Sequence, residues 1–461
     1  MDNDNFHQLK AISILDGRNW DKMEDVRDYF SEFALMKYRV KTEILYIIFL
    51  SENTKIIPGL GKEMKRQMNE IWQDFSKKDA HIIKQHEAKI NHDVKAVEYF
   101  LRDKFSLLKL SKLEPFIHIG LTSYDVNIPA YAQMLDGFRK EVLLARLGIL
   151  MEKLSGLVRL TSEMSMLGRT HGQPALPTTM GKELAVFYQR LKKEFKNLYK
   201  WNFEAKLTGA VGNYNALSFV YPQYDWLEQS RKFIRSLSLS PNVVTTQIIP
   251  YDNWLAFFDS VKRTNYILNN LAQDMWWYIS LDYFHQKKKE EEVGSSTMSH
   301  KVNPITFENA EGNLQLANTM FEFFGRKLSS SRLQRDLSDS TIKRDFGLAF
   351  GFTLLAWDSL LSGFSRVSPN KEKMEEDLDS HWEIFSEGLQ TYLRSCGGTK
   401  AFELLKDKTR GNVLTRKDVY DLIDGLPIKK KEKEFLKIDS LKKYQGLTKQ
   451  IIDVALSTKE E

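Results

Sequence analysis

Residues 143–160 read Leu-Leu-Ala-Arg-Leu-Gly-Ile-Leu-Met-Glu-Lys-Leu-Ser-Gly-Leu-Val-Arg-Leu, and leucine recurs there at steps of four and three. Apolar side chains at that spacing lie on one face of an α-helix. Large apolar residues recur in the same way from Trp254 to Tyr278. Both stripes are longer than an average globular helix, so the sequence predicts an all-α fold around a central bundle of long helices.

Short segments rich in glycine, proline and small polar residues interrupt this helical pattern. They lie at 57–61, 169–177, 208–222, 240–250, 294–304 and 365–369. From these breaks we predict an N-terminal helical domain over 1–112, a long-helix bundle over 113–364 and a C-terminal helical domain over 365–461. β-branched residues gather only between Asn242 and Ile249, where we expect an extended, strand-like loop.

Composition argues against several classes of protein. Hydrophobic residues make up 42% of the 461 residues, which is ample for a large core. The single cysteine excludes a disulfide within the chain and fits a reducing, cytoplasmic compartment. The start Met1-Asp2-Asn3-Asp4 has no apolar run, so we expect no secretory signal, and no uncharged stretch predicts a membrane span. A net charge of +6 is small for this length and does not predict nucleic-acid binding.

The most specific local pattern is Gly294-Ser295-Ser296-Thr297-Met298-Ser299-His300-Lys301-Val302-Asn303-Pro304. Its glycine and serines predict a flexible loop, and Pro304 predicts the start of a helix. Such a loop can fold over a bound anion and bring a serine oxygen and a cation to the same carbon atom. The spacing G-S-x-x-M-x-x-K-x-N resembles the signature loop of the fumarase/aspartase superfamily, whose members eliminate fumarate from a succinyl group.

Other short polar segments narrow this resemblance to the adenylosuccinate lyase family. They lie at 16–18 (DGR), 91–98 (NHDVKAVE), 122–125 (TSYD), 168–174 (GRTHGQP), 245–247 (TTQ) and 335–344 (RDLSDSTIKR). The likeness runs from about Asp16 to the C-terminal domain. It implies an elongated helical bundle in a homotetramer, with each active site built from three subunits. The resemblance implies no cofactor, and the sequence has no His or Cys pair at metal-ligand spacing.

Elimination of fumarate needs a base for the carbon-bound proton, a positive charge near the carboxylate and an acid for the departing nitrogen. By the resemblance, Ser295 is the base, Lys301 stabilises its alkoxide and His171 is the acid. His92 competes for the acid role, but the resemblance favours a role in orienting the substrate or His171. Asp93 is the neighbour expected to hold the His92 ring. Without the spacing of the loop, the simpler interpretation is that Ser295 caps the following helix.

The substrate that the resemblance implies carries a phosphate. Arg335 and Arg344 suit it, because a guanidinium pairs with two phosphate oxygens at once, and Ser340 shares a face with Arg344 if that segment is helical. From the residues alone, both arginines would equally form salt bridges with Asp336, Asp339 and Asp345. The other predicted substrate-binding residues are Arg18, Asn91, Asp93, Thr122, Ser123, Thr170, Gln247, Ser296, Val302, Asn303, Asn309 and Thr341.

The resemblance therefore implies a cytoplasmic, homotetrameric carbon–nitrogen lyase of purine biosynthesis. It would split adenylosuccinate into AMP and fumarate, and the succinylated aminoimidazole carboxamide ribotide (SAICAR) into AICAR and fumarate, with no metal, nucleic acid or membrane involved. One alternative is a superfamily lyase for argininosuccinate, aspartate or malate, but a free amino acid needs no phosphate clamp. A second is an inactive helical scaffold, which the filled base, acid and cation positions disfavour.

Overall fold

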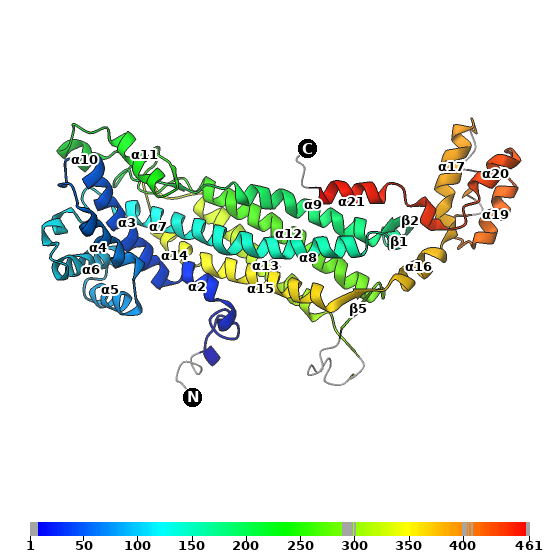
Figure 1. The fold of residues 1–461 in the computed structure, drawn as a ribbon, viewed down its shortest axis with the longest axis horizontal. Helices are drawn as coiled ribbons and strands as arrows, with labels where there is room; N and C mark the ends of the chain where they lie inside the picture. Colours follow the sequence, from blue (N-terminus) through cyan, green and yellow to red (C-terminus); the bar gives the residue numbers. More distant parts are fainter. Residues whose placement is uncertain are drawn as a thin grey trace. The chain divides into compact units, whose positions relative to one another are not determined.

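The computed structural model describes residues 8–287, 298, 301–398, 403, 405–406 and 409–457. The chain forms two compact units, each made of three separate stretches. Unit 1 comprises Met1–Leu147, Glu194–Tyr266 and Gly312–Ala356, and unit 2 comprises Gly148–Lys193, Ile267–Glu311 and Trp357–Glu461. The predicted all-α class is confirmed, because helices dominate both units (Figure 1).

Long helices contribute residues to both units. They are α8 (Leu144–Leu160), α9 (Met180–Tyr199), α12 (Asp252–Ser280), α13 (Ile305–Leu328) and α15 (Phe346–Arg366). The two long helices predicted from the apolar stripes of the sequence are confirmed as α8 and α12. Ser338–Arg366 is apolar enough by composition to span a membrane, but 67% of its most apolar window is buried inside the protein, as in a core helix.

Unit 1 contains the helices of the N-terminal region. They are η1 (Trp20–Lys22), α2 (Glu24–Phe30), α3 (Glu32–Asn53), α4 (Lys62–Gln73), α5 (Lys77–Ile90), α6 (Asp93–Leu107), η2 (Ser111–Phe116), α7 (Ser123–Phe138) and the π-helical turn η3 (Arg139–Leu143). Its later segments supply α10 (Asn215–Val220), α11 (Trp226–Ser236), α14 (Ser338–Lys343) and the parallel strands β3 (Glu204–Ala205) and β4 (Ser240–Pro241). The expected extended segment at 242–249 is an irregular loop after β4.

Aromatic side chains form the centre of unit 1. The ring of Phe258 on α12 lies 4.9 Å from that of Phe346 and 5.5 Å from that of Phe321, measured between centroids. Phe350, one turn further along α15 than Phe346, lies 4.9 Å from Phe138 at the end of α7. Rings at these separations bury large apolar areas, so they fix α7, α12, α13 and α15 against one another in this unit.

Unit 2 contains two small antiparallel sheets and the C-terminal helices. The sheets pair β1 (Ser165–Thr170) with β2 (Gln173–Thr179) and β5 (Phe284–Gln286) with β6 (Val367–Pro369). The helices are α16 (Lys371–Asp379), η4 (Trp382–Phe385), α17 (Ser386–Ser395), α19 (Arg416–Asp424), α20 (Lys430–Leu436), η5 (Leu441–Tyr444) and α21 (Thr448–Leu456). Leu167 of β1 is buried in one cluster with Leu378 and Trp382, so the first sheet is packed on the C-terminal helices.

The hairpin formed by β1 and β2 corrects the interpretation of 169–177 as a simple break between helices. His171 and Gly172 form its two-residue turn, with φ of 52° and 74°. Positive φ at both central residues is the conformation that matches the twist of a hairpin. The two compact units are made of discontinuous stretches, so they do not test the predicted domain boundaries near 112 and 364. Those boundaries stay predictions.

Candidate active site

A cavity of about 430 Å³ in unit 1 collects residues that are far apart in the sequence. The predicted site residues that line it are Asn91, His92, Asp93, Ser123, Arg335, Ser340, Thr341 and Arg344. Glu87, Val94, Asn127 and Leu337 complete its wall. The fold thus brings three of the polar segments of the sequence to one place, as a binding site requires.

A tight corner between two helices positions Asn91, His92 and Asp93. Asn91 ends α5 in the left-handed conformation with φ 54°, which asparagine tolerates better than most residues. His92 then caps α6, because its Nδ1 accepts the backbone N–H of Lys95 at 3.1 Å. An accepting Nδ1 places the proton of a neutral ring on Nε2, the nitrogen available to a ligand.

Asp93 is held by two arginines, whereas the sequence predicted a partnership with His92. Its Oδ2 lies 2.7 Å from a terminal nitrogen of Arg39 and 3.0 Å from one of Arg344. Burial alone would raise the pKa of Asp93, but the guanidinium of Arg39, with a smaller contribution from Arg344, holds this pKa below its ordinary value. Arg39 also donates to Asn127 at 2.7 Å, so it is a buried support of the cavity that sequence reasoning missed.

The start of α7 brings Ser123 to the cavity. The backbone N–H of Thr122 donates to Asp125 at 3.0 Å, which closes the first turn of the helix. Asp125 is fully buried, lies 3.0 Å from the ammonium of Lys206 and accepts the backbone N–H of Thr208 at 2.9 Å. The T-S-x-D segment is therefore a structural anchor in which Ser123 lines the cavity and Asp125 holds the fold.

Arg335 has one donor that is buried and finds no partner among the described residues. One terminal nitrogen donates to Gln247 Oε1 at 3.0 Å, which joins a predicted site residue to the cavity. The second terminal nitrogen is 3.5 Å from Ser340 Oγ. The Nε atom is buried and has no hydrogen-bond partner within the described part of the chain. A buried guanidinium N–H without a partner is destabilising, so this group is suited to an anionic ligand.

The sequence left open salt bridges of Arg335 and Arg344 with nearby aspartates. The structure instead pairs Asp339 and Arg344 with other residues. Asp339 pairs with Lys343 at 2.6 Å, and Arg344 pairs with Asp93. Burial alone would raise the pKa of Asp339, but Lys343 lowers it. Burial lowers the pKa of Lys343 to about 8, against the raising effect of Asp339. The two groups are therefore an ion pair at neutral pH. Sequence reasoning overlooked Lys343, because a lysine among charged residues suggests a solvated position.

In unit 2, the tip of the β1–β2 hairpin carries His171. Its side chain is exposed, as is that of Thr170. Arg169 anchors the strand beneath them through an ion pair of 2.6 Å with Asp377 on α16, and Tyr283 bonds the same carboxylate. The hairpin therefore presents His171 to the exterior of its unit on a rigid base.

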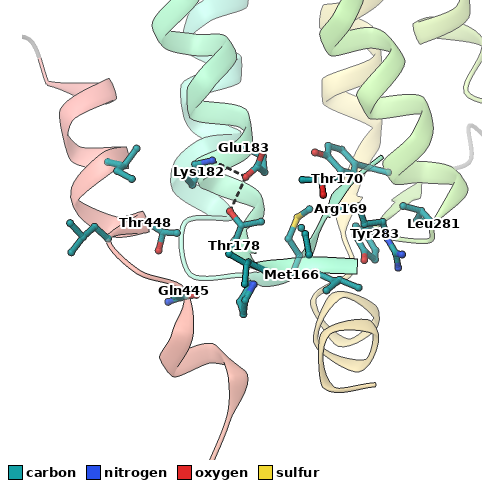
Figure 2. Close-up of a pocket in the computed structure, with 18 residues that line it drawn as sticks. Met166, Arg169, Thr170, Thr178, Lys182, Glu183, Leu281, Tyr283, Gln445 and Thr448 are labelled. Carbon is teal, nitrogen blue, oxygen red and sulfur yellow. Dashed lines mark hydrogen bonds and ion pairs between the residues drawn. The ribbon is translucent and has the colours of Figure 1, made fainter. Parts of the chain in front are cut away.

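A second cavity, of about 480 Å³, lies beside this hairpin within unit 2. Figure 2 shows Thr170 and Arg169 near Tyr283 on one side, and Thr178 bonded to Glu183, which also contacts Lys182, on another. Apolar residues such as Met166 and Leu281 fill most of the rest of its wall. Because Lys182 is paired with Glu183 and Arg169 with Asp377, the described residues that line this cavity offer no unpaired charge to a ligand.

The remaining predicted residues stand as follows. Ser295 and Ser296 lie outside the described residues. Lys301 is exposed, the carbonyl of Val302 accepts from Gln286 Nε2 at 2.8 Å, and Asn303 precedes α13, on which Asn309 is exposed. Arg18 is exposed in a turn of unit 1 and is not among the residues that line its cavity. In the described ranges, no group of three His, Cys, Asp or Glu is arranged to hold a metal ion.

Comparison with solved structures identifies the class of the fold. The chain matches a fumarate lyase from Mesorhizobium sp. BNC1 with a TM-score of 0.74 and 17% identity, over 95% of this chain and 98% of that one. It also matches the β-carboxy-cis,cis-muconate cycloisomerase of Acinetobacter calcoaceticus, with a TM-score of 0.71 and 16% identity, over 94% and 97%. A family model described as "Lyase" matches residues 17–318. The fold is thus that of the fumarase/aspartase lyases.

Comparison of sequences is more specific. The model described as "Adenylosuccinate lyase C-terminal" matches residues 331–445. Proteins named adenylosuccinate lyase are 43% identical in Legionella pneumophila (strain Corby), over 96% of this chain and 98% of the relative, and 40% identical in Escherichia coli K12, over the same shares. The relative in Dictyostelium discoideum is 43% identical, over 96% and 97%. The chain belongs to the adenylosuccinate lyase family and is a lyase.

Proposed function

We propose that this enzyme eliminates fumarate from adenylosuccinate to give AMP, and from SAICAR to give AICAR. The observation that carries the proposal is the cavity of unit 1, which both Arg335 and Arg344 line. Two guanidiniums, and a buried N–H of Arg335 that has no partner in the part of the chain that the structure describes, suit the phosphate that both substrates carry. The names of the full-length relatives supply the reaction.

The roles of the reacting groups follow from the chemistry of the elimination. The Ser295 oxygen takes a proton from the methylene carbon of the succinyl group, and Lys301 stabilises the charge on that oxygen. The electron pair of the broken C–H bond forms the double bond of fumarate while the carbon–nitrogen bond breaks. His171 gives its proton to the departing nitrogen. The exposed position of His171 at the hairpin turn supports this role, because its imidazole is accessible to a bound substrate.

The polar residues of unit 1 orient the substrate. His92 contacts the substrate through Nε2, and Asn91, Ser123, Gln247 and Thr341 supply neutral hydrogen bonds that fix orientation. The other residues that we propose to contact the substrate are Arg18, Asp93, Thr122, Thr170, Ser296, Val302, Asn303 and Asn309. The enzyme acts without a cofactor.

We further propose a cytoplasmic homotetramer whose active sites each take residues from three subunits. The exposed His171 supports sharing, because an acid that faces the exterior of its own unit is available to a partner subunit. In its subunit, Asp377 and Tyr283 fix the strand that carries it.

Fumarate release tests the proposed substrate. The purified chain is incubated in parallel with adenylosuccinate, SAICAR, argininosuccinate, aspartate and malate. We expect release from the two purine substrates alone, since the others carry no phosphate for Arg335 and Arg344. Release from argininosuccinate but not from adenylosuccinate contradicts the proposal.

A further inference from the structure

Tyr124 links several parts of the unit 1 cavity. It is buried in the first turn of α7, directly after Ser123. Its hydroxyl lies 2.8 Å from Ser340 Oγ and 2.7 and 2.8 Å from the two carboxylate oxygens of Asp339. The centroid of its ring is 4.1 Å from the central guanidinium carbon of Arg335. One side chain thus contacts both Arg335 and Ser340, which line the cavity.

The hydroxyl contacts fix the orientation of Ser340. A phenol has a single hydrogen, and an ionised carboxylate only accepts, so the hydrogen of Tyr124 goes to Asp339. The phenolic oxygen is then an acceptor for the hydroxyl of Ser340. This bond selects one position for the Ser340 oxygen, beside the terminal nitrogen of Arg335 at 3.5 Å.

The ring contact fixes the orientation of Arg335. A guanidinium over an aromatic face is attracted by the negative charge of that face. The second constraint is the hydrogen bond to Gln247, so the ring and the amide together hold the guanidinium while its buried Nε keeps no partner within the described residues. The group is oriented before an anion arrives, which lowers the entropy lost on binding.

Lys343 neutralises Asp339, a buried carboxylate that would otherwise oppose a phosphate here. Its ammonium lies 2.6 Å from Asp339 and donates to the hydroxyl of Tyr251 at 2.6 Å. Tyr251 in turn donates to Asp339 at 2.8 Å. The ammonium is also 4.4 Å from the ring centroid of Tyr124. The network has no net charge, so Tyr124 has a strong acceptor without adding negative charge at the cavity.

We propose that Tyr124 is a positioning residue that sets Arg335 and Ser340 for the phosphate of the nucleotide, with the Lys343–Asp339 ion pair as its neutral support. This inference rests on the proposed function, because it assigns the phosphate end of that substrate. Tyr124 contacts no reacting atom and acts through the two residues that it holds.

Tyr124→Phe tests the inference, because it removes the hydroxyl and keeps the ring. We expect the KM for adenylosuccinate and the dissociation constant of AMP to rise about tenfold, as for the loss of one hydrogen bond to a charged group. The kcat and the affinity for adenosine, which lacks the phosphate, should stay within about twofold of the original values. Tyr29→Phe is the control, since it also removes a buried tyrosine bond to a carboxylate in unit 1, to Glu141 at 2.5 Å.

Calorimetry with AMP and adenosine separates the possible outcomes. Unchanged AMP affinity in Tyr124→Phe, or an equal loss for AMP and adenosine, overturns the inference, and so does the absence of AMP binding to the unmodified protein. If the unmodified protein binds AMP but releases no fumarate from adenylosuccinate, the proposed function fails while the comparison of AMP with adenosine still decides the role of Tyr124.

A second pair of variants tests the neutral support. Lys343→Met leaves Asp339 buried without its counter-ion, and we expect AMP to bind about tenfold or more weakly. Adding Asp339→Asn removes the excess negative charge and keeps an acceptor oxygen for Tyr124, so most of the affinity for AMP should return. If the double variant binds AMP no better than Lys343→Met, the neutralising role of Lys343 is wrong.

Discussion

At the scale of single residues, the unit 1 cavity is controlled by how its arginines are paired. Arg344 shares Asp93 with the buried Arg39, whereas Arg335 keeps a buried N–H without a partner in the described residues. The shared carboxylate orients Arg344 and offsets part of its positive charge. Among the described residues no carboxylate forms an ion pair with Arg335, so Arg335 is the stronger candidate for the phosphate contact.

Arg335→Lys should therefore impair binding although the charge is kept. Lysine lacks the planar fork and the Nε–H, and its ammonium does not stack over Tyr124 in the same way. We expect AMP to bind about tenfold more weakly, a change typical of losing a bidentate contact. The measurement is calorimetric titration with AMP. Arg66→Lys on the exposed face of α4 is the control, and an equal effect of the two variants contradicts the assignment.

Asp93→Asn should lower stability in a pH-dependent way. The pKa of Asp93 is depressed in the folded state, so its contribution is present above the unfolded pKa of about 3.9 and is lost as the pH falls through the folded pKa. We expect a loss of about 1–2 kcal/mol at pH 7, less than for a fully buried pair because the carboxylate is partly exposed. The gap in unfolding free energy between the two proteins should begin to narrow near about pH 3.9 and close as the pH falls below the lowered folded pKa of Asp93.

Denaturant titrations at several pH values measure this difference. Asp25→Asn is the matched control, because Asp25 also pairs with an arginine, Arg146, but half of its side chain is exposed. The control should change stability by at most about 0.5 kcal/mol. A gap between Asp93→Asn and the original protein that persists in acid contradicts the linkage.

At the scale of elements, sequence patterns predicted the long helices but not the hairpin. Helices α8 and α12 carry an apolar stripe whose period is independent of tertiary context. The hairpin contains Pro174 and Pro177, which usually argue against strands. Proline is tolerated here because both strands of a two-stranded sheet are edges. The His171–Gly172 turn was the available signal, since glycine at the second turn position favours the observed φ of 74°.

The candidate site, too, could be predicted from the sequence only in part. The polar segments were recognisable in the sequence because each interrupts a helical stripe, and the fold brings those around Asn91, Ser123 and Arg335 together. Their supports were not recognisable. Arg39 sits within the apolar α3 and Lys343 within a charged run, and only the tertiary packing buries them.

Gly172→Ala tests the importance of the hairpin turn. A Cβ at Gly172 meets no heavy atom within 4 Å, so any effect comes from its φ of 74°. That conformation is unfavourable for alanine by about 1 kcal/mol. We expect a several-fold loss of kcat through displacement of His171, with little change in AMP affinity. Gly59→Ala is the control, because it also has open space but no positive φ. Equal kcat in both variants contradicts the prediction.

At the scale of the whole molecule, the proposed sharing of active sites predicts complementation. Ser295→Ala and His171→Ala should each lower kcat by orders of magnitude. When the two inactive proteins are unfolded and refolded together, some sites will combine an intact Ser295 with an intact His171, so fumarate release should partly recover. Native mass spectrometry verifies the mixed tetramers. No recovery in verified mixtures contradicts the sharing of sites.

The assembly of unit 1 from three stretches has a consequence for the synthesis of the chain. Tyr124 and its partner Lys343 are 219 positions apart, and the last stretch of the unit ends at Ala356. The first two stretches of unit 1 are therefore made before its last stretch, which carries both Asp339 and Lys343. Folding of this unit must wait until synthesis has reached Ala356 of the 461 residues, so products truncated before that point will depend on chaperones and become substrates for proteases.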